Sequence, residues 1–237
     1  MSGHSKWATI KRAKGAADAK RGKLFSKLAK NISVAVQTGG STDINFNFKL
    51  RMAVDKAKQA AMPADNIDRA IKRGAGEGKE AIQNVTYEGY GPAGSAVIID
   101  AVTDNKNRTT QTVRNIFTKA GGRMGEQGSV AWMFESKGQI LLEKQPGLEE
   151  LSLDLIDEGA EDIKETEHGM EVYTLPIDLE KVKKYIESKG IKILDAEVVM
   201  KPNQSVDLSE SDMAVLQKLL DALDDDDDVI NVHTNVN

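Results

Sequence analysis

Basic residues gathered around one tryptophan are the part of this sequence whose chemistry is easiest to state. Between Met1 and Lys30 there are nine Lys or Arg residues and one acid, Asp18, and Trp7 lies among the first of the cations. Contact with the phosphates of a nucleic acid requires this density of positive charge. The predicted nucleic-acid-binding residues are Lys6, Trp7, Lys11, Arg12, Lys14, Lys20, Arg21, Lys23 and Lys27.

The same residues have plainer interpretations. A basic segment can act as a solubilising tail, but a local positive cluster adds little solubility to a protein that is acidic overall. The first eighteen residues show almost no apolar periodicity and form what we call the basic arm. Trp7 could stack on an unpaired base, or it could anchor the basic arm against the folded part of the chain. We therefore favour phosphate contact for the cations and keep both roles open for Trp7.

The distribution of charge along the chain supports contact with a polyanion. Residues 1–80 contain 17 Lys or Arg against 7 Asp or Glu, and residues 81–237 contain 15 against 30, so the two parts carry +10 and −15. A positive field at one end and a negative field elsewhere steer a polyanion onto the amino-terminal part. The modest net charge of −5 conceals this asymmetry.

Acidic and histidine residues are the candidate metal ligands of this sequence. The run Asp224–Asp228 could chelate a divalent cation, but a run that follows a helix and precedes a strand is more often a solvated connection. His4, His168 and His233 lie far apart in the sequence, and the chain has no cysteine to complete a zinc site. We expect no metal site.

A phosphate-binding loop is the remaining chemical candidate, because glycines precede Lys79. Arg73 stands where that motif requires its first glycine, and Glu80 replaces the hydroxyl residue. The glycine-rich segment also precedes a predicted strand instead of opening a helix, so it is better explained as a linker. No serine-elbow, metalloprotease or kinase signature occurs, so we expect no catalytic residues, no cofactor and no small-molecule substrate.

The spacing of apolar residues predicts a helical bundle first. Leu24, Leu28, Ile32 and Val36 repeat every three or four residues, which indicates a helix from about residue 19 to Gly39, and two more helices are expected over 50–61 and 63–73. The lysines of the first helix lie on a stripe separate from its apolar face. One face is expected to pack and the other to meet anions.

Strand-like patterns follow the linker. Strands are predicted at 85–87, 96–102 and 129–134, with a helix over 107–120. Asn105, Asn107 and Arg108 precede this helix, where such residues cap it, although a binding role also stays open. The tail offers a helix with four leucines and a strand at 229–232. Between them, a β-α-β-β-α-β order is predicted. Its elements are 139–143, 148–158, 162–166, 171–175, 179–188 and 193–200.

These elements predict an α+β fold with three domains. An N-terminal helical bundle is followed by two α+β, ferredoxin-like sandwiches, the third domain being inserted into the second. The predicted limits are 1–79, then 80–136 plus 203–237, and 137–202 for the insertion. The sequence contains no apolar run near the length of a membrane span and no signal-peptide core, so we expect a cytoplasmic protein without a membrane partner.

Several segments resemble the YebC/PmpR family. The resemblance rests on Gly3–Trp7, Arg21–Lys27 and Tyr87–Pro92. It extends through Met62–Ile67, Thr103–Thr109 and Gly128–Phe134 and is looser in the tail. It implies a three-domain fold and a transcriptional regulator that binds promoter DNA, and it also links the chain to mitochondrial translational activators and to ribosomes paused on proline-rich sequences.

Two mechanisms therefore remain open. A transcriptional regulator would place lysines such as Lys20 and Lys23 on the phosphates of duplex DNA, although the predicted helix offers mainly Lys and no recognition face rich in Arg, Asn and Gln. A ribosome-associated translation factor would extend the basic arm into ribosomal RNA. At about 3.3 Å per residue, eighteen residues reach at most ~60 Å.

Overall fold

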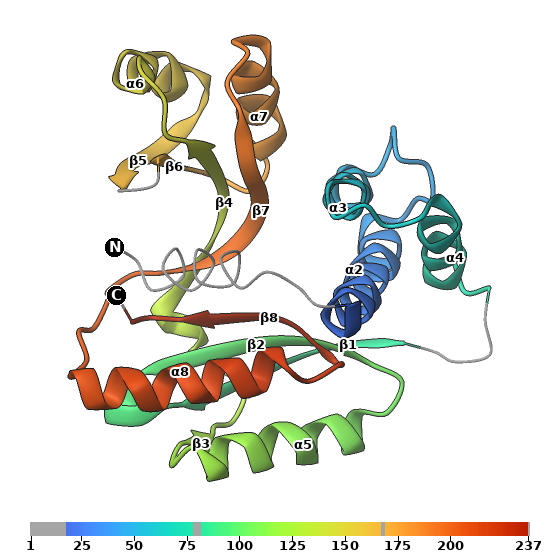
Figure 1. Ribbon diagram of the computed structural model, residues 1–237, viewed down its shortest axis with the longest axis vertical. Coiled ribbons are helices and arrows are strands. Elements are labelled where there is room, and N and C mark those ends of the chain that lie inside the picture. The colour runs from blue at the N-terminus through green and yellow to red at the C-terminus, as the bar shows by residue number, and fades with distance from the viewer. Residues whose placement is uncertain (1–17, 78–81, 167–168, 237) are drawn as a thin grey trace. The chain divides into compact units, whose positions relative to one another are not determined.

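The computed structural model describes residues 18–77, 82–166 and 169–236. Within them the chain forms two compact units, one made of Glu135–Lys201 and the other of the described residues before and after it (Figure 1). These residues form helices and two four-stranded sheets, which confirms the predicted α+β class. The domain limits at residues 79, 136 and 202 stay predictions.

The larger unit begins with three helices. These are α2 (Asp18–Gly39), α3 (Phe48–Gln59) and α4 (Ala64–Gly74). Their core contains Leu28, Ile32, Leu50 and Val54, so the predicted apolar face of the first helix is the one that packs. Asn47 caps α3 by accepting a hydrogen bond from the Leu50 amide, and its side-chain amide donates to the carbonyls of Ala35 and Ser41. The α2–α3 turn is thereby fixed to both helices.

A four-stranded sheet forms the rest of the larger unit. It contains β1 (Gln83–Tyr90), β2 (Ala96–Thr103), β3 (Arg123–Met124) and β8 (Val229–Thr234), in the order β3-β1-β2-β8. The short 3₁₀ turn η1 (Pro92–Gly94) joins β1 to β2. Figure 1 shows α5 (Lys106–Lys119) and α8 (Glu210–Asp224) on the same face of the sheet. Their shared core includes Ile99, Phe117 and Leu219.

The smaller unit has the predicted β-α-β-β-α-β order. It contains β4 (Phe134–Glu143), α6 (Leu148–Glu158), β5 (Ala160–Thr166), β6 (Gly169–Thr174), α7 (Leu179–Ser188) and β7 (Ile193–Pro202). The strand order is β5-β6-β4-β7, and β6 pairs antiparallel with both β4 and β5. The alternating residues Ile140 and Leu142 of β4 are fully buried, as the period of a strand with one covered face requires.

One predicted strand is wrong. Residues 129–134 form the 3₁₀ turn η2 (Ala131–Met133), and β4 begins only at Phe134. The reason is a hydrogen-bonded anchor: the carboxylate of Glu88, on β1, accepts the backbone amides of Gly128, Val130 and Ala131 at 2.6, 2.7 and 2.8 Å. Amides that point at one carboxylate cannot pair with a neighbouring strand.

Candidate nucleic-acid interface

Helix α2 carries Lys23 and Lys27 of the predicted site on one stripe together with Lys30, which the predicted site left out. Lys23, Lys27 and Lys30 follow each other at spacings of four and three residues, which places them on one face of a helix. The apolar residues on the other face of α2, such as Ile32, are buried against α3 and α4. Packing of the bundle therefore orients the lysine stripe away from the bundle core.

The lysine stripe is occupied by the carboxyl-terminal acidic run. The ammonium of Lys27 donates to the Asp224 carboxylate at 3.0 Å, and that of Lys30 donates to Asp228 at 2.7 Å. Lys23 lies 3.3 Å from the carboxylate of Asp225. Each ammonium also donates to a main-chain carbonyl of the run, those of Asp225, Asp224 and Asp227 in the order of the lysines.

The acidic run comes at the end of α8, and this explains why it attracts lysines. The last turn of α8 contains no basic residue, and its C-cap residue is Asp225. The carboxyl end of a helix carries partial negative charge, so aspartates there raise the electrostatic free energy. Lysines from α2 supply the positive charge that α8 itself lacks at this end.

Asp228 is the most enclosed of the paired carboxylates, with 13% of its side chain exposed. Besides Lys30, it accepts hydrogen bonds from Thr109 at 2.7 Å and from Arg108 at 3.0 Å. Burial acts to raise the pKa of Asp228, but the hydrogen bonds from Lys30, Thr109 and Arg108 outweigh it and lower the pKa to about 2. Asp228 is therefore ionised at neutral pH and ties the start of α5 to β8.

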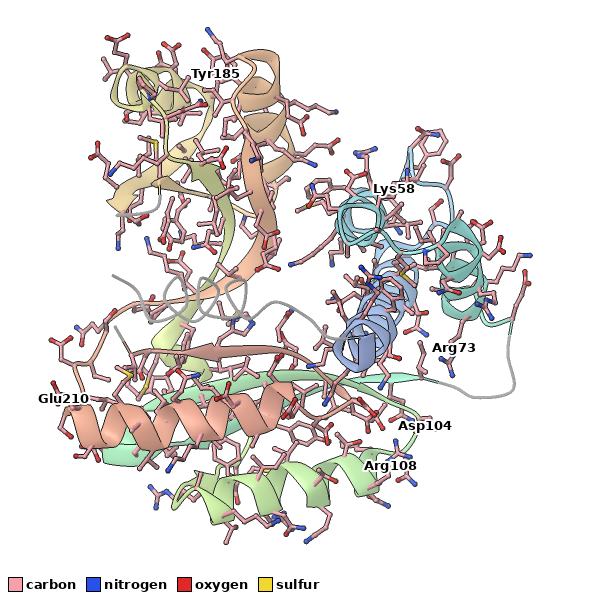
Figure 2. All side chains as sticks on the ribbon, viewed as in Figure 1. Lys58, Arg73, Asp104, Arg108, Tyr185 and Glu210 are labelled. Carbon is pink, nitrogen blue, oxygen red and sulfur yellow. The ribbon has the colours of Figure 1, made fainter. Side chains whose placement is uncertain are left out.

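Arg108 belongs to the same cluster. Its guanidinium donates to Asp104 at 2.8 Å as well as to Asp228, and Figure 2 shows Asp104 and Arg108 side by side at the start of α5. Asn105 caps α5 by accepting the Arg108 amide at 3.1 Å, which confirms the capping role predicted for this turn. The Thr103–Thr109 motif is thus a structural turn that holds Asp228.

Two expectations about these residues change. The interpretation of the aspartate run as a solvated connection holds for Asp225 and Asp227, which are exposed, but it fails for Asp224 and Asp228, which are largely enclosed and bound to lysines. Lys27, predicted to face anions, does so, but the anion belongs to the chain itself and only 9% of the Lys27 side chain is exposed. A contact between residues some 200 positions apart leaves no local sequence pattern.

The other predicted site residues are placed as follows. Arg21 is exposed on α2, and Lys20 lies in α2 with its side chain outside the described part. The arm residues lie outside the described residues. They are Lys6, Trp7, Lys11, Arg12 and Lys14.

Further cations that the prediction left out lie on α3 and α4. Those with exposed side chains are Lys49, Lys58, Arg69, Lys72 and Arg73. Lys58 and Arg73 project outward from α3 and α4 in Figure 2. The +10 charge of residues 1–80 already contained these cations, and their exposed positions on the predicted helices were the signal that was available.

In the described part of the chain, no group of three or more His, Cys, Asp or Glu residues is arranged to hold a metal ion. No helix there is long and apolar enough to cross a membrane.

The chain is a three-part α+β protein, in which a lysine-bearing helical bundle is followed by two four-stranded sheets with their helices. Family models for the TACO1/YebC N-terminal domain and for the TACO1/YebC second and third domains match residues 5–77 and 82–236. The chain belongs to the TACO1/YebC family, which confirms the resemblance drawn from its motifs.

Relatives match over the full length. Proteins named "probable transcriptional regulatory protein" from Syntrophus aciditrophicus and Trichlorobacter lovleyi are 48% and 49% identical, over 99% of this chain and 95% of each relative. The crystal structure of a conserved hypothetical protein from Aquifex aeolicus matches with a TM-score of 0.85 and 45% identity. That match covers 93% of this chain and 91% of the other.

Proposed function

We propose that this protein is a non-enzymatic regulator of gene expression that acts by binding nucleic acid through its amino-terminal 80 residues. The observation that carries the proposal is the division of charge, +10 before residue 81 and −15 after it. Phosphate backbones are attracted to the first part and repelled by the second, so the charge provides both affinity and orientation.

The contacts we propose come from two sets of residues. The first is the basic arm with Arg21, and the second is the exposed cations of the helical bundle, including Lys49, Lys58 and Lys72. Neither set includes a dense array of Arg, Asn and Gln on one helix, which is what readout of base edges needs. The expected binding is therefore mostly to the backbone and falls steeply with salt.

Transcriptional regulation by binding duplex DNA is the function we place first, because the full-length relatives bear that name. On this proposal the helical bundle and the arm grip the duplex, and the acidic α+β units face away from it or contact other proteins. Selectivity for a promoter would come from the shape and deformability of the DNA.

A ribosome-associated translation factor is the second candidate. It is favoured by the dominance of Lys over base-reading residues on α2, a composition that suits attachment to a folded RNA. On this proposal the arm enters a channel in ribosomal RNA, and the protein relieves stalls at proline-rich sequences by positioning alone.

One pair of assays separates the two candidates. The full chain is titrated against specific and scrambled duplex DNA at physiological salt, and it is also sedimented with ribosomes. Sequence-selective DNA binding without ribosome association would establish the transcriptional regulator. Ribosome association without DNA preference would establish the translation factor, and failure of both would refute the proposed function.

The matched variants test where the binding resides. K6A/K11A/R12A/K14A removes four cations from the arm, and K181A/K184A/K189A/K192A removes four exposed cations from the smaller unit. We expect the arm variant to lose binding and to show a shallower dependence on salt, because fewer counterions are released. The variant of the smaller unit should bind as the wild type does.

A further inference from the structure

The lysine stripe of α2 already binds an anionic chain segment that has features of a nucleic-acid backbone. The run Asp224–Asp228 presents successive negative groups from the last residue of α8 into the turn before β8. Three of its carboxylates accept hydrogen bonds from Lys23, Lys27 and Lys30. At 1.5 Å per residue, these lysines span about 10 Å along the helix. A phosphate backbone offers charges on the same scale.

We propose that the run Asp224–Asp228 is an internal competitor of nucleic acid, which occupies the lysine stripe of α2 until a polyanion displaces it. The inference rests on the proposed function and deepens it, since it adds a regulated set of contacts to those of the arm. With the run in place the protein binds through its arm and exposed cations; with the run displaced, Lys23 and Lys27 join them.

The pairs differ in exposure along the stripe, and displacement begins at the most exposed one. The middle pair, Lys27 and Asp224, is 9% and 27% exposed. At one end Lys23 and Asp225 are accessible, with 30% and 82% of their side chains exposed. At the other end Lys30 and Asp228 are 19% and 13% exposed, and Asp228 is also held by Thr109 and Arg108. Exposed ion pairs contribute about 0–1 kcal/mol, so the Asp225 end is exchangeable while Asp228 remains anchored.

Competition of this kind depends on proximity. The run and the lysines belong to the same compact unit, so the aspartates act at a high effective concentration. A lysine paired with an aspartate carries no counterion for a nucleic acid to release, so it adds nothing to the salt dependence of binding. Once the run is neutralised, each freed lysine that meets a phosphate adds to that dependence.

The test neutralises the exchangeable end of the run and leaves Asp228 intact. D224N/D225N removes two charges but keeps an oxygen acceptor at both positions. E126Q/E210Q is the matched control, because it removes two exposed carboxylates from the same unit outside the run. Both full-length variants and the wild type are titrated with a 20-nucleotide polyuridylate and a 20-base-pair DNA over a series of salt concentrations.

We expect D224N/D225N to bind either probe about threefold or more tightly than the control does. Its log–log salt slope on the single strand should be steeper by about 1.4, or roughly 0.7 for each of two added phosphate contacts. Adding Lys23→Gln should reduce affinity more in the D224N/D225N background than in the wild type. This coupling separates relief of competition from a general loss of negative charge.

The outcomes distinguish the two proposals. If the wild type binds the probes and D224N/D225N matches the control in affinity and slope, the internal competitor is refuted and the proposed function stands. If only D224N/D225N binds, the competitor is supported. If no form binds a polyanion even at low salt, both proposals fail. Urea unfolding of each variant confirms that the compared proteins are folded.

Discussion

Glu88 shows how one residue can organise a segment forty positions away. Its side chain is almost fully buried, and its two oxygens accept three backbone amides of the η2 segment. Burial acts to raise the pKa of Glu88, but the hydrogen bonds from Gly128, Val130 and Ala131 lower it more, so its pKa lies below the ordinary value. The charged carboxylate is the form that fits.

Replacing Glu88 by Gln should therefore destabilise the fold. One amide would meet an NH₂ group in place of an oxygen, and an unsatisfied buried donor costs about 1–3 kcal/mol. Urea unfolding measures the loss, and Glu126→Gln, an exposed change in the same loop, should be neutral. Equal stability of the two variants would contradict the anchoring role.

The lowered pKa of Asp228 should make the free energy of unfolding fall at low pH. Its pKa falls from 3.8 to about 2 in the folded protein, so its contribution is complete above about pH 4 and is lost as the pH falls through 2. The difference between the two pKa values corresponds to about 2 kcal/mol. Urea unfolding at pH 5.5 and 2.5 should therefore show that the wild type loses more stability on acidification than Asp228→Asn does. Equal losses in the two proteins would contradict this role of Asp228.

Residue-level prediction from sequence succeeded where the cause was local. Asn105 was predicted to cap a helix because amide side chains favour that position, and it does. Glu88 and the lysine–aspartate contacts escaped prediction because their partners are distant along the chain. No pattern of spacing connects Lys27 with Asp224.

Most helices and strands could be predicted from the spacing of apolar residues along the chain. The predicted helices over 148–158 and 179–188 match α6 and α7, because each has an apolar stripe that packs, even though Leu153 and Ile156 of α6 are exposed. The strand predicted at 129–134 is wrong, since the Glu88 anchor overrides the strand tendency of this apolar run. Helix packing also depends on close approaches that periodicity does not encode.

Gly74 makes such an approach between α4 and α2. A Cβ atom there would lie 2.6 Å from the Ser33 carbonyl oxygen and 2.8 Å from Val36 Cβ. Gly74→Ala should therefore push the helices apart and cost about 1–3 kcal/mol. Gly22→Ala is the control, because nothing lies within 4 Å of its Cβ and alanine favours a helix interior by about 0.5–1 kcal/mol. Thermal unfolding should move in opposite directions, and a loss in both would contradict the packing argument.

The whole molecule is organised by charge. The acidic excess after residue 80 is used in part internally, where the end of α8 meets the lysines of α2. The class of fold and the basic character of the amino-terminal part followed from the sequence, because both are sums over many residues. The occupied state of the lysine stripe did not, because it depends on the tertiary fold.

Ultraviolet crosslinking in living cells tests the central claim most directly. Cells that produce the full-length protein are irradiated, and the peptides joined to nucleic acid are identified by mass spectrometry together with the type of nucleic acid. We expect crosslinks concentrated within residues 2–73, in the arm and the helical bundle. Crosslinks confined to residues 135–201, or a protein that captures no nucleic acid at all, would contradict it.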